Sequence, residues 1–477
     1  MGIISSIENF GNKVALISPG RGTFTYSDLI EQSFILKNYI KANSFILLVC
    51  TNSIETFIGY IFAIKNNCTV MLIDAKMRAE DINAVISAYN HDTILGPKYI
   101  LKELKVQQAE NIFNDFFDYG VLVLKTVRKK PFNKNICLLL PTSGSMGSRK
   151  FVVISKDNLY ANTNSIIKFL GITTKERAVT TMPFSYTYML SIVNTHLEVG
   201  ASILVTDKSL FTRSFWDDYT EHNVTSFSGV PYIYQILKKL ALEKIFTPSL
   251  NLITQAGGKL RYEIASELVK LCKQQGVKFV SMYGQTEATS RISYLDPKFC
   301  EKKIGSIGKP IPNGKMWIEN DNFEVITTAG HRGELVYKGP NVSWGYAHNY
   351  NDLCMAGQNN EMLRTGDIAY FDEDGFFYLD GRLKRIAKLF GIRLNLDELE
   401  EKMFDEGFLV VCLETEEKIG VFFEMEYCLD KLLNSLVKIT SQNKSGFLCV
   451  KIPKFPRTVS GKINYNQLTK EQHEFRL

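Results

Sequence analysis

Short apolar runs alternate with amphipathic segments between residues 13 and 283. The apolar runs predict buried strands at residues 14–18, 44–50, 69–74, 136–140, 151–155, 177–182, 201–206, 224–231, 252–256 and 277–282. A helical period predicts helices at 53–65, 155–171, 190–199 and 262–275, and the capping groups of Thr25 and Asp28 open one more. This alternation of strand and helix argues for α/β layers with parallel strands.

From about residue 305 the pattern changes to short alternating runs with frequent glycines, which predicts a β-rich subdomain. Residues 381–385 have the composition of a junction, and a small pattern of strands and helices follows. We therefore predict an α/β protein with a large N-terminal domain of α/β layers and a β-rich subdomain (1–381). A hinge (382–385) and a small C-terminal α+β domain (386–477) follow.

Composition narrows the function classes. The 56 Lys and Arg against 50 Asp and Glu give a net charge of +6, too mild and dispersed to favour nucleic acid as a partner. The nine cysteines form no CxxC pair, which is typical of reduced thiols in a cytoplasmic protein. No charged-then-apolar signal segment opens the chain, and no apolar run approaches the roughly 18 residues of a membrane span. We expect a cytoplasmic protein with no membrane span.

A loop rich in glycine and hydroxyl groups follows the strand at 136–140. Its potential anion donors are Thr142, Ser143, Gly144, Ser145, Gly147, Ser148, Arg149 and Lys150. Glycines allow backbone N–H groups to approach an anion closely, so the loop is a candidate polyphosphate site. A polar surface turn after a core strand explains the loop equally well. The spacing of the two glycines excludes the P-loop of NTPases, which needs four residues between Gly and Gly-Lys-Ser/Thr.

Two further motifs stand where predicted strands end. Gly257 and Gly258 follow one strand, and the sequence Tyr-Gly-Gln-Thr-Glu at 283–287 follows the next. Because ligands of open α/β sheets bind outside the carboxyl ends of the strands, these motifs predict one shared pocket. Either motif alone is more often an ordinary strand end or turn.

Together these stretches resemble the adenylate-forming superfamily of acyl-CoA synthetases, peptide-synthetase adenylation domains and luciferases. The resemblance runs from about Thr25 to Lys462. It rests on five short motifs in the family's order, namely the glycine loop, Tyr283–Glu287, Thr365–Asp367, Gly381–Arg382 with Lys388–Gly391, and Ser460–Lys462. The family implies activation of a carboxylate by ATP as an acyl-adenylate, followed by transfer to a thiol of CoA or of carrier-protein phosphopantetheine. It also implies that the small domain is mobile.

The resemblance assigns roles to individual residues. For ATP or AMP it implies Thr142, Ser143, Gly144, Ser145, Gly147, Lys150, Gly257, Gly258, Tyr283, Gly284, Gln285, Thr286, Asp367 and Arg382. Glu287 would hold Mg²⁺, and Lys462, Thr286 and Lys150 would act in catalysis. The hinge would be Lys384, and Gly391 would line the thiol tunnel. The acyl pocket would be formed by Tyr186, Thr187, Ser228, Gly229, Gln255 and Ala256.

The acyl pocket departs from that of amino-acid-activating members. Those enzymes place an aspartate against the substrate amine, where this chain has Thr187, and no acid lies between Thr187 and Leu197. This disfavours an ordinary α-amino acid. The polar and aromatic residues at 185–188 favour a short, hydroxylated or aryl acid over a long fatty chain.

The hinge position gives a first testable prediction. In the family the small domain swings about this residue between the two half-reactions, and here it is Lys384. We expect Lys384→Pro to spare adenylation and to slow thioester formation, because proline restricts the backbone rotation. Separate assays of the two steps would refute this if both rates fell equally.

Two other functions remain open from the sequence. One is an amino-acid-activating enzyme that loads a separate acidic carrier protein. The other is a non-catalytic nucleotide-binding relative, which the loss of Lys462, Glu287 or Asp367 would have favoured; all three residues are present.

Overall fold

The computed structural model describes residues 4, 7–106, 109–125, 131–142, 150–357, 361–390, 392–415, 418–458, 461–465 and 467–469. The chain divides into two compact units. The first joins Met1–Lys315 to Lys338–Leu363, and the second joins Met316–Tyr337 to Arg364–Leu477. The hinge predicted at 382–385 stays a prediction.

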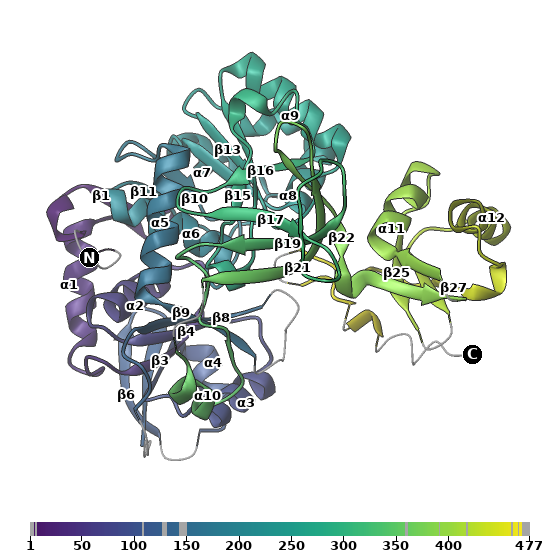
Figure 1. Ribbon diagram of the computed structural model, residues 1–477. Helices are drawn as coiled ribbons and strands as arrows, with labels where there is room; N and C mark the ends of the chain where they lie inside the picture. The colour runs from purple at the N-terminus through teal and green to yellow at the C-terminus, as the bar shows by residue number, and fades with distance from the viewer. Residues whose placement is uncertain are drawn as a thin grey trace. The chain divides into compact units, whose positions relative to one another are not determined.

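The first unit contains a sheet with the strand order β20-β9-β8-β4-β3-β5-β7-β6 (Figure 1). Strands β8, β4, β3 and β5 run parallel, and antiparallel strands extend both edges. The strands are β3 (Phe45–Cys50), β4 (Thr69–Asp74), β5 (Thr93–Pro97), β6 (Ala109–Phe116), β7 (Tyr119–Leu124), β8 (Ile136–Pro141), β9 (Phe151–Ser155) and β20 (Tyr346–Ala347). The predicted hairpin around the glycine loop is confirmed by the antiparallel pairing of β8 with β9.

A second run of strands in this unit has the order β16-β15-β14-β13-β12-β10-β11-β1-β2. Strands β14 through β1 in that order are parallel, which places their carboxyl ends at one edge. The bounds are β1 (Val14–Ser18), β2 (Gly22–Thr25), β10 (Arg177–Val179), β11 (Ser202–Leu204), β12 (Ser226–Gly229), β13 (Leu252–Gln255), β14 (Lys278–Tyr283), β15 (Ser293–Tyr294) and β16 (Ser306–Pro310).

Helices of this unit pack on both sheets. α2 packs on β3 and β4, α6 packs on β10 and β11, and α5 contacts both α6 and the β8–β9 hairpin. The helices are α1 (Tyr26–Leu36), α2 (Ile54–Lys65), α3 (Ala79–Tyr89), α4 (Lys98–Glu103), α5 (Lys156–Leu170), α6 (Thr187–Val199), α7 (Arg213–Glu221), α8 (Pro231–Leu240), α9 (Tyr262–Gln275) and α10 (Tyr350–Met355).

Local sequence explains where several of these helices begin and end. The side chains of Thr25 and Ser155 each accept a hydrogen bond from the backbone three residues on, in capping boxes that start α1 and α5. Gly171 ends α5 in the left-handed conformation, with a φ of +69°. Helix α6 begins at Thr187, three residues before the predicted start at 190, so Thr187 lies in its first turn.

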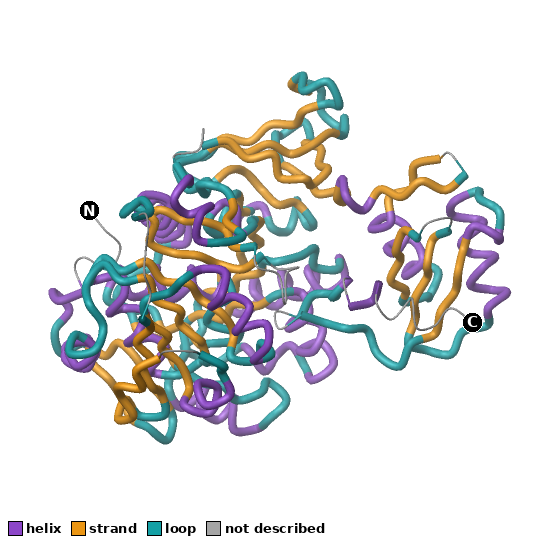
Figure 2. The backbone as a smooth tube through the Cα atoms, turned by 90° about the horizontal axis from the view of Figure 1, so that it is seen from below, coloured by secondary structure: helices purple, strands orange, loops and turns teal. Residues whose placement is uncertain are grey.

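The second unit begins with the strand order β18-β17-β19-β21-β22. It continues with a hairpin of β23 and β24 and a three-stranded sheet, β25-β26-β27. Its elements are β17 (Lys315–Glu319), β18 (Val325–Ile326), β19 (Gly333–Lys338), β21 (Met362–Phe371), β22 (Phe377–Arg382), β23 (Ile386–Leu389), β24 (Ile392–Asn395), α11 (Leu396–Asp405), β25 (Val410–Glu414), β26 (Ile419–Phe423), α12 (Leu429–Thr440) and β27 (Phe447–Lys451). Figure 2 shows helices lying against the small sheet near the carboxyl end.

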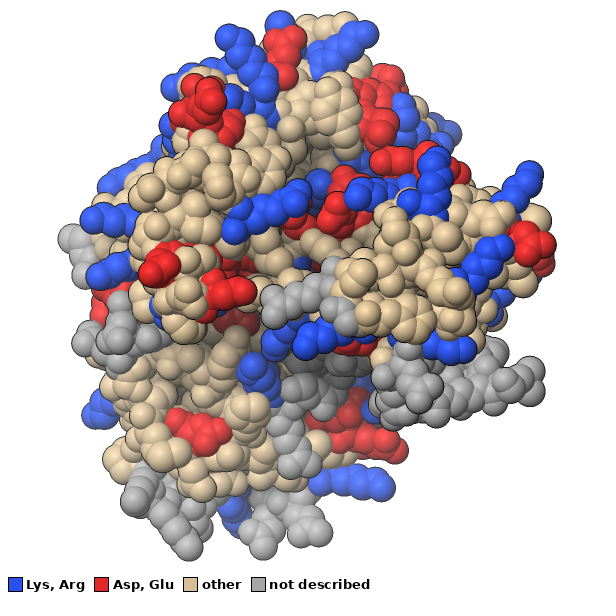
Figure 3. Space-filling model, turned by 45° about the vertical axis from the view of Figure 1, so that its right-hand side comes forward, with Lys and Arg blue, Asp and Glu red and all other residues tan. Residues whose placement is uncertain are grey.

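The surface and the cysteines agree with the expectations from composition. On the face drawn in Figure 3, basic and acidic side chains are interspersed rather than gathered by sign. All nine cysteines are free thiols, and six of them are buried. Among the described residues, no helix is both long and apolar enough to cross a membrane.

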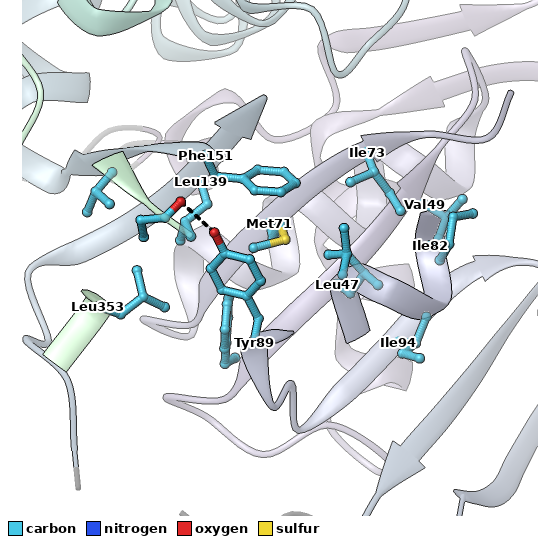
Figure 4. Packing of buried hydrophobic residues seen from close by; sticks show 14 of the residues in the cluster. Leu47, Val49, Met71, Ile73, Ile82, Tyr89, Ile94, Leu139, Phe151 and Leu353 are labelled. Atoms are coloured by element: carbon cyan, nitrogen blue, oxygen red, sulfur yellow. Dashed lines mark hydrogen bonds between the residues drawn. The ribbon is translucent and has the colours of Figure 1, made fainter. Parts of the chain in front are cut away.

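A buried cluster on the first sheet helps to hold β20 against β9, the strand that follows the glycine loop (Figure 4). It combines side chains of β3 and β4 with Ile82 and Tyr89 of α3 and with Leu353 of α10. The Tyr89 hydroxyl donates a 2.6 Å hydrogen bond to the carbonyl of Ala347 in β20. Strand β20 has only two residues, so this core contact helps to hold it against β9.

The buried His196 in α6 predicts a pH dependence of stability. Its Nδ1 contacts the carbonyl of Ile192 at 2.8 Å, and its Nε2 is buried with no hydrogen-bond partner among the residues that the structure describes. Burial lowers the pKa of His196 to about 4. An unfolded chain binds this proton below about pH 6.5, so the free energy of unfolding should fall by about 3 kcal/mol between pH 6.5 and 4.

Denaturant unfolding of the whole chain at a series of pH values would measure this effect. We expect His196→Gln to flatten the slope between pH 6.5 and 4, and the exposed His331→Gln to leave it unchanged. A slope that is the same in both variants and in the parent would assign the pH dependence to other groups.

Candidate active site

The predicted pocket motifs lie on neighbouring strands of the first unit. Gly229 at the end of β12 aligns with Gln255 at the end of β13, and Gln255 aligns with Ser281 of β14. The hydroxyl of Ser281 donates a 3.2 Å hydrogen bond to Gln255, whose amide donates to the carbonyl of Gly258 at 2.7 Å. These strand ends therefore lie side by side at one edge of the sheet, and Tyr283 is the last residue of β14. The shared pocket at this edge stays a prediction.

The segment after β14 turns back sharply at Gly284. A Cβ atom there would lie 1.8 Å from the carbonyl oxygen of Ser290, so only glycine fits. Thr286 then opens a short 3-10 helix and is buried. The amide of Asn341 donates to the carbonyls of Ala288 and Arg291 at 2.8 and 2.9 Å. These bonds fix the loop that carries the predicted phosphate and metal residues.

Glu287 and Lys150 are brought together through Tyr346, a residue that the sequence gave no reason to choose. The Tyr346 hydroxyl donates a 2.8 Å hydrogen bond to Oε1 of Glu287. Nζ of Lys150 lies 3.5 Å from the centre of the Tyr346 ring. The pairing of β20 with β9 explains this geometry, because Tyr346 pairs with Val152, two residues beyond Lys150. A carboxylate and a cation from distant motifs thus share one neighbour.

Removing the Tyr346 hydroxyl should loosen Glu287 without disturbing the fold. Phenylalanine keeps the ring beneath Lys150 and deletes only the hydrogen bond, which contributes about 1 kcal/mol. If Glu287 holds Mg²⁺ in an adenylating enzyme, as the resemblance implies, we expect Tyr346→Phe to raise the Mg²⁺ concentration for half-maximal pyrophosphate release about fivefold. The exposed Tyr262→Phe is the matched control, and equal Mg²⁺ requirements in the two variants would contradict a positioning role for Tyr346.

The predicted acyl-pocket residues meet at the start of α6. Tyr186 is the N-cap of this helix, and Thr187 follows with its side-chain oxygen buried and without a hydrogen-bond partner among the described residues. The hydroxyls of Tyr188 and Ser228 each share a 2.7 Å hydrogen bond with the hydroxyl of Thr254. Burial raises the pKa of Tyr186 to about 12, so its phenol stays neutral. The named contacts are rich in hydroxyl groups, and the first turn of α6 contains no acid.

Some predicted residues are not described. Ser143, Gly144, Ser145 and Gly147 of the glycine loop, with Ser148 and Arg149, lie outside the described residues, as does Gly391. Thr142 and Lys150 mark the two ends of that loop, next to β8 and β9.

The second unit carries the other predicted nucleotide residues. Asp367 of β21 pairs with Arg382 of β22 in the sheet, and Nε of Arg382 lies 2.9 Å from Oδ1 of Asp367. The hydroxyl of Thr365 accepts a 3.2 Å hydrogen bond from the backbone of Asp367. The side chain of Asp367 is 7% exposed and that of Arg382 is 61% exposed. The sequence prediction that these two side chains are neighbours is thus consistent with the structure.

Lys384 lies in a one-turn 3-10 helix, Leu383–Arg385, directly before a strongly anchored residue. Arg385 forms ion pairs with Asp397 at 2.8 Å and Glu400 at 2.5 Å, and donates to the carbonyl of Cys412. Gly381, three residues before Lys384, has a φ of +145°, and a Cβ there would lie 2.4 Å from the side chain of Asn395. Lys384 therefore stands between two constrained positions of the second unit.

Lys462 lies on a backbone turn of the second unit. Its N–H donates to the hydroxyl of Thr458 at 3.2 Å, and its carbonyl accepts from the N–H of Thr458 at 2.7 Å. Arg457 and Ile463 form a β-bridge on either side. These bonds hold the backbone at Lys462.

Residues 5–347 match the sequence profile of the AMP-binding enzyme family. The chain belongs to this family of AMP-binding enzymes. The resemblance inferred from the five motifs is confirmed, and so is the predicted α/β fold class with a small C-terminal domain.

Two of the relatives that this AMP-binding enzyme matches are CoA ligases. It is 26% identical over 426 residues to the oxalate–CoA ligase of Arabidopsis thaliana, covering 84% of this chain and 82% of the relative. It is 30% identical over 269 residues to the 2-succinylbenzoate–CoA ligase of Bacillus cereus. This second match covers 55% of this chain and about half, 53%, of that relative. The protein is an enzyme of the acyl-CoA synthetase type.

Solved structures share the fold over nearly the whole chain. The o-succinylbenzoate CoA synthetase of Bacillus subtilis, in complex with its acyl-adenylate, superposes with a TM-score of 0.77 at 19% identity and covers 98% of both chains. The same synthetase with ATP and a magnesium ion gives a TM-score of 0.77 at 20% identity, with the same coverage. At these identities the likeness supports the fold alone.

Proposed function

We propose that this enzyme activates a carboxylic acid with ATP and transfers the acyl group to the thiol of CoA. In the first step a carboxylate oxygen bonds to the α-phosphorus of ATP, and the bond from that phosphorus to the bridging oxygen breaks and releases pyrophosphate. In the second step the thiolate sulfur bonds to the acyl carbon, and the bond from that carbon to the AMP oxygen breaks. Family membership and the CoA-ligase relatives support both steps.

The observation that carries the proposal is the chain of contacts from Lys150 through Tyr346 to Glu287. The first step joins two anions, so it needs fixed donors and cations around the phosphates. Lys150 ends the loop predicted to bind phosphate, and Glu287 follows Thr286 in the loop after β14. Their convergence in one unit supports a single polyphosphate site at the edge of the sheet.

The residues present suit Mg²⁺ as the companion of ATP. Glu287 offers one carboxylate, and the Tyr346 hydroxyl bonds to only one of its oxygens. Among the described residues no group of three or more His, Cys, Asp or Glu could form a protein cage for a metal. Magnesium is usually bound by one or two carboxylates together with substrate phosphates, so this set fits it. When bound, the ion would neutralise charge on the phosphates.

The remaining roles are proposed from the resemblance, residue by residue. Thr286 would donate its hydroxyl to a phosphate, and Tyr283 with Gly257 and Gly258 would contact adenine. In the second unit Asp367 would accept the ribose hydroxyls, with Arg382 beside it. Lys462 would place a single positive charge between the substrate carboxylate and the α-phosphate, a role for which a compact ammonium group is suited.

The first detail that family membership leaves open is the thiol that accepts the acyl group. The names of the two curated relatives give CoA as their thiol. A carrier-protein phosphopantetheine presents the same chemical thiol, and a separate acidic carrier would be a partner of this mildly basic protein. We favour CoA because of those relatives.

The second detail that family membership leaves open is the acid that the enzyme activates. The structure argues against an α-amino acid. Recognition of an amine calls for a carboxylate in the pocket, yet the first turn of α6 presents Thr187 and Tyr188. The buried charged residue that contacts this turn is a cation, Arg291, whose guanidinium lies 4.1 Å from the centre of the Tyr188 ring. A positive charge there would repel an ammonium group.

Pyrophosphate release with Mg-ATP across a panel of acids tests the proposal. The panel holds fatty, aryl, hydroxy, dicarboxylic and amino acids, each with and without CoA. Release that requires one acid and that CoA accelerates is the expected result. Release without any effect of CoA would favour a carrier protein as acceptor, and silence across the panel with ATP still bound would overturn the ligase function.

A further inference from the structure

Arg291 is a buried cation with no acidic partner among the described residues. The residue is 3% exposed, and no carboxylate of the described residues pairs with it. Its guanidinium stacks on Tyr188, and burial lowers its pKa. Arginine keeps its proton in proteins even so. Buried charges are normally paired, because an uncompensated charge in a protein interior is strongly unfavourable.

The hydrogen bonds of Arg291 leave part of its donor capacity unused. One terminal nitrogen donates to the hydroxyl and the carbonyl of Ser290 at 2.6 and 3.2 Å. The other contacts only the hydroxyl of Ser191, at 3.3 Å, and Nε points to the sulfur of Met282 at 3.4 Å. A guanidinium has five N–H donors. Among the described residues, one of the five has no acceptor, and the sulfur is a weak one.

The position of Arg291 connects the nucleotide side of the site to the acyl side. It lies four residues after Glu287, and its own carbonyl is held by Asn341 and Asn162. Ser290, to which it donates, in turn donates to the carbonyl of Thr187 at 3.3 Å. The side-chain oxygen of Thr187 is buried and has no hydrogen-bond partner in the part of the chain that the structure describes. Ser290 thus links Arg291 to the backbone of Thr187 at the predicted acyl pocket, and Tyr188, the residue after Thr187, lies against the guanidinium.

We propose that Arg291 binds a second carboxylate of the acid substrate, so that the enzyme is selective for dicarboxylic acids. This inference rests on the proposed ligase function and specifies its substrate class. One carboxylate of the acid is activated by ATP. The other accepts hydrogen bonds from the guanidinium, which provides the missing counter-charge, and from the Thr187 hydroxyl. The side chain of Tyr188 holds the guanidinium in place by stacking.

Matched substrate pairs test whether the enzyme recognises the negative charge of the second carboxylate. Each aliphatic and aryl dicarboxylic acid of the panel is compared with its own half-amide, which has nearly the same size but lacks the second charge and carries a donor NH2 in place of one acceptor oxygen. We expect the best diacid to exceed its half-amide at least 100-fold in kcat/KM for pyrophosphate release. Arg291→Gln should lower this ratio at least tenfold, and Arg291→Lys should retain part of it.

Arg177→Gln is the matched control, since it removes another partly buried cation from the opposite, amino end of the β10 strand. The control should leave the diacid preference unchanged. Because Arg291 is buried, every variant is first checked for cooperative thermal unfolding and for ATP binding. Arg291→Lys keeps the proposal testable if Arg291→Gln does not fold.

The results separate this inference from the ligase proposal. A monoacid used as well as any diacid by the parent enzyme would overturn the inference and leave the ligase function standing. An equal loss for diacid and half-amide in Arg291→Gln would also overturn it, because that pattern indicates a purely structural arginine. If no acid releases pyrophosphate, the ligase proposal fails first. Calorimetric titration of the parent with diacid and half-amide in the presence of ATP then tests the carboxylate site without turnover. Equal binding of the two compounds refutes that site.

Discussion

Lys462→Gln should reduce adenylate formation by about 10²–10³-fold. The proposed role of this lysine is to bring the substrate carboxylate and the α-phosphate together, and glutamine is of similar length without the charge. The backbone bonds between Lys462 and Thr458 involve no side-chain atom of Lys462, so the turn should survive the change. The rate of pyrophosphate release with the best acid of the panel measures adenylate formation.

Supplying a synthetic acyl-adenylate tests the second step separately. We expect Lys462→Gln to transfer the acyl group from this adenylate to CoA at nearly the parental rate. Lys454→Gln removes an exposed lysine eight residues away and should leave both steps unchanged. An equal loss of both steps in Lys462→Gln, or no loss in either, would contradict the assignment of Lys462 to adenylation.

Glu287→Gln should have a comparable effect through a different cause. The amide keeps the size of the side chain and can still accept from Tyr346, but it lacks the negative charge that a magnesium ion requires. We expect kcat/KM for Mg-ATP to fall about 10²–10³-fold. A tenfold increase in the Mg²⁺ concentration should restore only part of the loss.

The exposed Glu263→Gln in α9 is the control for this variant. Its Mg²⁺ dependence should match that of the parent. Binding of ATP without Mg²⁺ should persist in Glu287→Gln, because the phosphate donors are unchanged. A variant that loses ATP binding entirely in the absence of Mg²⁺ would show that Glu287 shapes the nucleotide site rather than holding the ion.

Much of the fold follows from local sequence. Helix α9 has the predicted bounds of Tyr262–Gln275, and β1 and β4 also have their predicted bounds. These segments are bounded by strong local signals, such as an apolar run or a glycine such as Gly276, which ends α9 in the left-handed conformation. The predicted start of α6 was wrong by three residues, because no side chain caps the actual start at Tyr186 and no local signal marks it. Tertiary hydrogen bonds hold the earlier turn, from Tyr188 to Thr254 of β13 and from Ser290 to the carbonyl of Thr187.

The candidate site likewise has parts that the local sequence predicts and parts that depend on the tertiary structure. Glycine positions, the hydroxyl-rich loop and the Tyr-Gly-Gln-Thr-Glu segment are contiguous in sequence, so their spacing alone indicates the chemistry. Tyr346 is 59 residues from Glu287, and nothing near it in the sequence points to a metal or a phosphate. Its role depends on the pairing of β20 with β9 and on the contact of Tyr89 with Ala347.

Arg291 shows the difference most clearly. In the sequence it is one arginine beside short apolar and hydroxyl residues, and a solvent-exposed charge is the ordinary expectation for such a residue. The sequence determined that this chain is an AMP-binding enzyme, because motifs for a phosphate site are local arrangements of glycine, hydroxyl and charge. Only the tertiary structure decided that Arg291 is buried without a carboxylate, because burial and pairing depend on which distant side chains pack around a residue.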